Sequence, residues 1–248
     1  MKRLLISLAV LSAAISCTFN SAIVGSGVPA DKTIELSSFE SIVLKGSLDL
    51  YIIQTEGVHQ AVLHADDNLI DYYTFEVVGN TLEISTKSGV SIVPKEKAVA
   101  IISVEQLSKV KVTGSGDIVI PGALSASRDV TLSISGSGDI EANDIACGDF
   151  VSKISGSGDI SLGTLSSKDA YFEINGSGDV VIETLSANSV GMKISGSGDI
   201  TAGCEDAGAI DITINGSGDV NLHGSASSLT HKVNGSGKVN ARALSLAN

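Results

Sequence analysis

Apolar and polar residues alternate on both sides of a recurring Gly-Ser-Gly tripeptide in the second half of this 248-residue chain. In each copy, an aliphatic residue stands two positions before the first glycine and another stands four positions after it. Alternation with a period of two is typical of a β-strand with one buried face. Each copy therefore predicts two short strands that meet at the Gly-Ser-Gly, followed by a return segment.

The Gly-Ser-Gly copies recur at a nearly constant interval. They begin at Gly114, Gly136, Gly156, Gly176, Gly196, Gly216 and Gly235. A period of about 20 residues indicates a solenoid, in which each repeat stacks on its neighbours. The sequence thus predicts an all-β fold, a right-handed parallel β-helix with coils of about 20 residues and irregular N-terminal coils.

The spacing also predicts which corner residues face inward. Between Ile134 and Ile140, Gly136 and Gly138 share the inward phase, whereas the two serines and Asp139 face outward. A tight corner leaves little room inside the coil, and glycine has no side chain to place there. Stacked coils lie about 4.8 Å apart, so the corner should carry parallel ladders of Ser or Asn, of Ser, and of Asp.

The repeat pattern weakens before residue 111 but does not vanish. The segment 42–52 matches the repeat with Leu48 in place of the second glycine, and Gly79-Asn80 interrupts an alternating segment as a tight hairpin would. We therefore expect one β-helix domain over 34–248, with irregular first coils over 34–110 and the regular repeats over 111–248. A separate small β domain at the N-terminal end is the alternative.

The amino terminus has the pattern of an export signal. Lys2 and Arg3 precede an apolar run that ends at Ile15, which is too short to span a membrane. The segment 14–17 is similar to a bacterial lipobox, in which Cys17 would be acylated after removal of residues 1–16. Residues 17–33 would then form a tether, and Thr18 favours the outer membrane. Simple cleavage that leaves Cys17 as a free thiol is the alternative.

The charge of the chain limits the classes of partner. Lys and Arg number 16 against 28 Asp and Glu, for a net charge of −12. A surface of this sign repels nucleic acid and anionic lipid, so we expect no nucleic-acid partner and membrane attachment only through Cys17. Cys147 and Cys204 lie three repeats apart, too far for a disulfide.

An acidic ladder is the candidate binding ridge. Its six members follow the Gly-Ser-Gly copies: Asp117, Asp139, Asp159, Asp179, Asp199 and Asp219. Carboxylates about 5 Å apart repel one another, and calcium would relieve that repulsion because it takes oxygen ligands. The alternative is that each carboxylate accepts hydrogen bonds from corner N–H groups or serine hydroxyls. We expect the second arrangement, with no resident cofactor.

No other residues form a catalytic or metal-binding pattern. His59 and His64 are five apart, so on one strand they would face opposite sides. The chain has no zinc-type spacing of Cys and His, no phosphate loop and no nucleophile elbow. A second outward row predicts a solvated face with weak ion pairs. Its members are Lys111, Ser133, Lys153, Glu173, Lys193, Thr213 and Lys232.

Several short motifs, together with the Gly-Ser-Gly-Asp repeats, resemble the bacterial head GIN domain. They are Phe39-Glu40-Ser41-Ile42, the segment 65–70 (ADDNLI) and the segment 79–84 (GNTLEI). The family is found as an adhesin head in exported proteins of Bacteroides-type bacteria. The resemblance covers roughly residues 36–220 and implies a β-helical fold and an exported location. It supplies no established catalytic residue.

Three functions are compatible with this reading. The first is a non-enzymatic cell-envelope protein, an adhesin or scaffold that presents repeated polar ladders to a glycan or protein partner, with multivalent contact. The second is a polysaccharide-cleaving enzyme, but a uniform ladder offers no unique pair of carboxylates. The third is a structural or envelope-stress accessory role.

Overall fold

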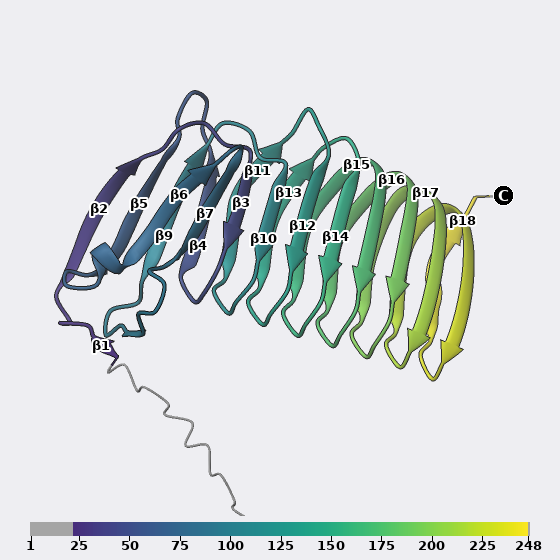
Figure 1. Cartoon of the computed structure of the whole chain (residues 1–248). Coiled ribbons are helices and arrows are strands. Elements are labelled where there is room, and N and C mark those ends of the chain that lie inside the picture. Colours follow the sequence, from purple (N-terminus) through teal and green to yellow (C-terminus); the bar gives the residue numbers. More distant parts are fainter. Residues whose placement is uncertain (1–21, 248) are drawn as a thin grey trace, which may run out of the picture.

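Parallel strands stack coil upon coil along an elongated rod in the computed structural model, which describes residues 22–247 (Figure 1). The fold is a β-solenoid of about seven turns with coils of about 20 residues, as the repeat period predicted. Residues 1–16 and Cys17, the predicted signal and acylation site, lie outside the described residues.

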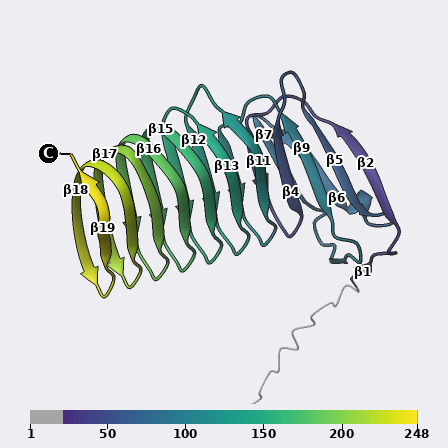
Figure 2. The same cartoon turned by 180° about the vertical axis from the view of Figure 1, so that it is seen from behind.

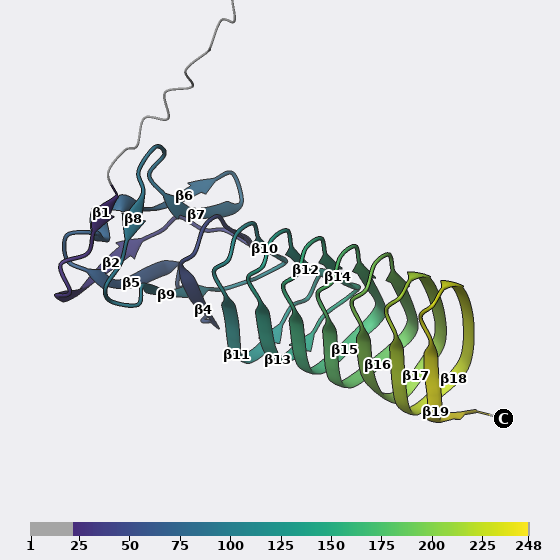
Figure 3. The same ribbon diagram turned by 90° about the horizontal axis from the view of Figure 1, so that it is seen from below.

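Each of the first regular coils has one strand before the Gly-Ser-Gly corner and one after it. The strands before the corner are β10 (Lys109–Val112), β12 (Val130–Ile134) and β14 (Phe150–Ile154). Those after it are β11 (Ile118–Ser125) and β13 (Ile140–Ala146). Figure 3 shows these two sets of strands on two faces of the rod.

In the later coils the strand continues through the return bend from one corner to the next. These long strands are β15 (Ile160–Ile174), β16 (Val180–Ile194), β17 (Ile200–Gly216) and β18 (Val220–Gly235), and β19 (Val239–Leu246) follows them. Neighbouring coils pair in parallel at an offset of one repeat, so Ile160 lies opposite Val180 and Ile200 lies opposite Val220. Residues at equal positions of the repeat therefore form columns along the rod.

The N-terminal end departs from chain order. A coil formed by β3 (Ser41–Leu44) and β4 (Asp49–Gln54) pairs in parallel with β10 and β11 on one side. On its other side it pairs in parallel with β7 (Thr81–Thr86) and β9 (Val99–Val104). The coil of residues 81–104 therefore lies outside the coil of residues 41–54, although it comes later in the sequence.

Antiparallel strands cover this end of the stack (Figure 2). β5 (Gln60–Asp66) pairs with β9, β2 (Pro29–Glu35) pairs with β5, and β6 (Tyr73–Val78) pairs with β7. The 3-10 turn η1 (Ile70–Tyr72) lies between β5 and β6, and β1 (Ile23–Val24) pairs with β8 (Ile92–Val93). Covering the outer edges in this way protects strands that would otherwise offer unpaired N–H and C=O groups.

Two local expectations for this end have different outcomes. The predicted hairpin at Gly79-Asn80 is present, because β6 and β7 are antiparallel and Gly79 has φ +62°. Within the segment 17–33, expected as a tether, residues 23–24 form β1 and residues 29–33 belong to β2. Isolated short strands carry little signal in the sequence, and these two are fixed by pairing with β8 and β5.

The inward columns form a continuous apolar core, as the alternation predicted. One column contains Leu132, Ser152, Phe172, Met192 and Ile212, all buried. The small Ser152 leaves room beside Phe150, whose ring centroid lies 5.8 Å from that of Phe172. The column ends at His231, which pairs with Ile212 and is exposed on the last coils.

Candidate functional site

The Asp ladder is tied together by hydrogen bonds between coils. The backbone N–H of Asp159 donates to Oδ1 of Asp139 at 2.8 Å, and that of Asp179 donates to Oδ1 of Asp159 at 2.7 Å. The same bond recurs at Asp139, Asp199 and Asp219. Each carboxylate thus accepts a backbone N–H, as expected, but the donor belongs to the next coil rather than to its own corner.

Asp49 at one end of the ladder and Lys238 at the other extend it beyond the six aspartates. The ladder begins one coil earlier than the sequence indicated, because Asp49 Oδ1 accepts the N–H of Asp117 at 3.0 Å. It ends at Lys238, whose N–H donates to Asp219 Oδ1 at 2.7 Å. Lys238 stands where the other repeats have Asp, and the ladder stops there because an ammonium group cannot accept an N–H.

The corner glycines face inward as predicted, but for a different physical reason. Gly158 is buried, Gly156 is half-buried and Ser157 is exposed. A Cβ on Gly158 would strike the carbonyl oxygen of Gly138 in the preceding coil, and a Cβ on Gly156 would strike that of Gly136. The crowding that excludes a side chain lies between stacked coils, along the rod axis, and not inside the corner. Glycine here permits the close stacking that the Asp ladder requires.

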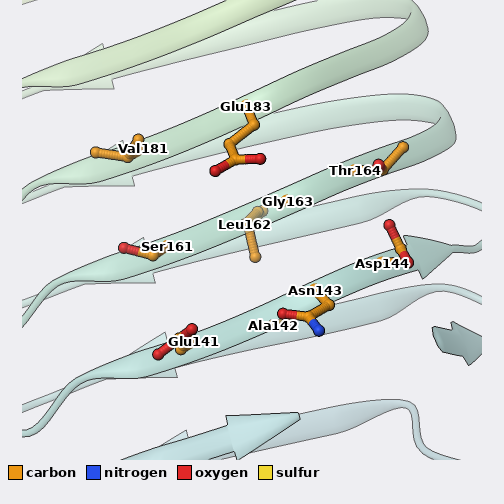
Figure 4. A pocket seen from close by; sticks show the side chains of 10 residues that line it. All are labelled: Glu141, Ala142, Asn143, Asp144, Ser161, Leu162, Gly163, Thr164, Val181 and Glu183. Atoms are coloured by element: carbon orange, nitrogen blue, oxygen red, sulfur yellow. The ribbon is translucent and has the colours of Figure 1, made fainter. Parts of the chain in front are cut away.

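A shallow groove of about 410 Å³ lies on the outer face of β13, β15 and β16 (Figure 4). The absence of a side chain at Gly163 hollows it between Asn143 and Glu183. Its lining adds two further carboxylates, on Glu141 and Asp144, to that of Glu183. The groove is therefore an open polar surface with several hydrogen-bond acceptors.

The second outward row carries one ion-paired cluster. Glu173 lies between two lysines of neighbouring coils, with its carboxylate 2.9 Å from Lys193 Nζ and 3.8 Å from Lys153 Nζ. The hydrogen bond from Lys193, together with the charges of both lysines, lowers the pKa of Glu173 although burial opposes that shift. This local cluster fits the expectation of weak exposed pairs on a solvated face.

A buried carboxylate that the sequence did not single out fastens the N-terminal segment. Asp66 is fully buried and accepts the backbone N–H groups of Gly27 at 2.5 Å, Lys95 at 2.9 Å and Glu96 at 3.1 Å. Burial alone would raise the pKa of Asp66, but the three N–H donors and the Lys95 charge lower it. Asp66 thus holds three segments together, and Gly25 packs directly against its carboxylate.

The two cysteines of the described chain are unpaired, as their separation predicted. Cys204 is buried in the core position that Leu185 fills in the preceding coil. Cys147 is half-buried, and burial raises the pKa of its thiol to about 11, with smaller contributions from the charges of Asp129 and Asp149. Because the thiolate is the reactive form, both are packing residues rather than nucleophiles.

His64 of β5 and His59, just before that strand, do not come together at one site. His64 Nδ1 lies 2.7 Å from Asp31 Oδ1, whereas His59 packs edge-on against Phe39 with a centroid separation of 5.4 Å. Over residues 22–247, no group of three or more His, Cys, Asp or Glu side chains is placed to hold a metal ion. Within the same range, no helix has the length and apolarity needed to cross a membrane.

The stacked coils with their in-register polar corner place the chain in the class of β-solenoid proteins, and comparison with known proteins identifies the family. The sequence model described as "Putative auto-transporter adhesin, head GIN domain" matches residues 38–206 and again residues 170–248. The chain belongs to this family, as the motifs in its first third and its repeats indicated. A comparison with curated proteins found no match.

Solved structures share the whole fold. A "putative adhesin" from Bacteroides fragilis superposes with a TM-score of 0.80 at 23% identity, covering 88% of this chain and 99% of that one. A "putative lipid binding protein" from Parabacteroides distasonis gives a TM-score of 0.68 at 24% identity, covering 88% and 98%. A "putative adhesin" from the same species gives 0.66 at 20% identity, covering 88% and 99%. At these identities the likeness shows the fold alone.

Proposed function

We propose that this protein is a non-enzymatic binding protein of the cell envelope, an adhesin-type scaffold that presents its corner ridge to a glycan or protein partner. The ridge comprises Asp117, Asp139, Asp159, Asp179, Asp199 and Asp219 with the serines beside them. The observation that carries the proposal is the strict register of the corner. Equal polar groups recur once per coil along a rigid rod, so that weak contacts can add.

The chemistry of the ridge supports recognition rather than catalysis. Oδ1 of each Asp is occupied by a backbone N–H, whereas Oδ2 forms no hydrogen bond within residues 22–247. A row of available acceptors suits the hydroxyls of a glycan or the N–H groups of an extended peptide. A uniform row does not single out one pair of carboxylates for acid–base chemistry at a scissile bond. In this proposal the ridge acts without a resident cofactor.

A binding screen on glycan and protein arrays, with the full-length protein, tests this function. The triple variant Asp159→Asn, Asp179→Asn and Asp199→Asn keeps the Oδ1 acceptors but removes three charges. The triple variant Glu141→Gln, Asp144→Asn and Glu183→Gln removes three charges from the groove in Figure 4 and is the matched control. We expect the ridge variant to lose binding and the groove variant to retain it. Loss in the groove variant alone would move the binding surface to that face.

The location of the protein is part of the same proposal. We propose that it is exported and anchored in the outer membrane through acylated Cys17. The Cys17→Ser variant is expected to leave the detergent-extracted membrane fraction and appear in the soluble fraction. Mass spectrometry of the mature amino terminus provides the direct measurement. An unmodified Cys17 in the wild-type protein would contradict the anchor.

A further inference from the structure

Charge is distributed unevenly along the rod. All 28 acidic residues precede residue 220, whereas the segment 220–248 carries Lys232, Lys238 and Arg242 and no Asp or Glu. The net charge of −12 is therefore an average over an acidic body and a basic end. The charge carried by the last coils thus has the opposite sign to the net charge of the coils before them.

Two of these three basic residues, Lys238 and Arg242, line a groove on the outer face of the last coils. The groove has a volume of about 700 Å³ and is lined by His223 of β18, Arg242 of β19 and Lys238 at the corner between those strands. All three residues are exposed. Asn221 and Asn240 form its floor, where the amide of Asn240 donates to Asn221 Oδ1 at 2.9 Å.

The side chains of Lys238, Arg242 and His223 have no hydrogen-bond or ion-pair partner within residues 22–247. Neither Lys238 Nζ nor the Arg242 guanidinium lies in an ion pair or a hydrogen bond there, and His223 has no side-chain hydrogen bond. Asp219, on the preceding coil, accepts the backbone N–H of Lys238 and not its ammonium group. By contrast, Lys153 and Lys193 of the acidic body share Glu173. The last coils thus hold uncompensated positive charge in one hollow.

We infer that this groove binds a phosphate group. A phosphate carries up to two negative charges on one tetrahedral centre, so it uses more than one cation at once. Arg242 offers a planar pair of N–H donors, Lys238 offers a mobile point charge, and His223 offers a ring N–H. The site lies on a different surface from the Asp ridge and does not depend on the function proposed for that ridge. A free phosphate or sugar phosphate and a phospholipid headgroup share this chemistry.

The test uses the full-length protein and two probes. Inorganic phosphate, titrated calorimetrically at constant ionic strength, represents the free anion. Co-sedimentation with phosphatidylglycerol vesicles, with phosphatidylcholine vesicles subtracted, represents the headgroup and removes any contribution from the leader or an acyl chain. The variant carries Lys238→Ala and Arg242→Ala. The control carries Lys109→Ala and Lys111→Ala, two lysines without ion pairs that change the net charge equally.

We expect at least a tenfold loss of affinity in the Lys238/Arg242 variant and no change in the control, for phosphate, for phosphatidylglycerol vesicles, or for both. Binding of inorganic phosphate would identify a soluble molecule as the source of the bound phosphate group. Binding of vesicles alone would identify a phospholipid headgroup. The Arg242→Lys variant should lose affinity to an intermediate extent, because lysine lacks the paired N–H donors of arginine. Thermal melts confirm that the variants fold. Absence of binding to either probe, or equal loss in the control, would overturn the inference.

Discussion

At the scale of single residues, the glycines of the corner decide how closely the coils can stack. Gly138 and Gly158 sit in consecutive coils with the carbonyl of the first directed at the α-carbon of the second. A methyl group at that α-carbon would occupy the position of the carbonyl oxygen. The inward phase of these glycines was predictable from the spacing of the neighbouring isoleucines. The direction of the crowding was not, because it depends on the coil that stacks below.

The variant Gly158→Ala is therefore expected to lower the free energy of unfolding by about 3 kcal/mol, through forced separation of the coils. Ser157→Ala changes the adjacent residue of the same corner, whose side chain faces outward, and should cost less than about 1 kcal/mol. Urea denaturation of both variants provides the measurement. Equal losses would show that the glycine is not constrained by the coil beneath it.

The hydrogen-bonding role of Asp66 could not be predicted from the sequence. It lies in the segment 65–70, which marked the resemblance to the family, but its three N–H donors come from residues about 30 to 40 positions away. Nothing in the local pattern indicates that Gly27 and Lys95 meet it. A buried carboxylate of this kind can be recognised only when the segments that surround it have been placed.

At the scale of strands and corners, the Asp ladder acts as a side-chain extension of the backbone pairing. Each carboxylate satisfies an N–H at a corner, where the chain turns between two strands. The alternation and the 20-residue period were enough to predict the strands, their inward faces and the carboxylate role. The first member, Asp49, was missed because Leu48 replaces the glycine that marks the other corners.

The ladder predicts a difference between two substitutions at one position. Asp179→Ala leaves the N–H of Asp199 without its acceptor and should cost about 1 kcal/mol of unfolding free energy. Asp179→Asn retains Oδ1 as an acceptor and should stay within about 0.5 kcal/mol of the wild type. Denaturant melts at pH 7 compare them. An Asn variant as unstable as the Ala variant would mean that the charge, rather than the acceptor, matters.

The Glu173 cluster predicts a dependence on pH. Its pKa is lowered in the folded protein, so its stabilising contribution is complete above the unfolded value, about 4.3, and is lost as the pH falls through the lower folded value. Because both lysines are substantially exposed, the contribution is about 0.5 kcal/mol. Glu173→Gln should therefore be less stable than the wild type at pH 7 and equal to it at a pH well below the lowered pKa. A difference that persists in acid would contradict this origin.

At the scale of the whole molecule, the rod is held by backbone pairing between coils and by an apolar core. The carboxylates that would be candidate calcium ligands already accept backbone N–H groups in every regular coil. Their spacing is fixed by the stacking of strands. The repulsion between these carboxylates is therefore offset by backbone N–H groups of the chain itself.

We accordingly expect millimolar calcium to leave the melting temperature unchanged within about 1 °C, measured against the same protein in a chelator. Stabilisation by a ligand requires preferential binding to the folded state. The triple variant Asp159→Asn, Asp179→Asn and Asp199→Asn provides the control. A calcium-dependent rise in melting temperature that disappears in this variant would establish a cation site on the ridge.

The interchange of the first two coils sets the order in time in which the rod can assemble. Residues 41–54 emerge first from the ribosome, yet both of their neighbours, residues 81–104 and 109–119, are made later. The first coil cannot be completed on either side until more than a hundred residues exist. After that point each new repeat can pair with a coil that is already complete, so the rod grows one coil at a time. We therefore expect the irregular beginning to set the pace of folding, with the long regular part added coil by coil on the surface that it provides.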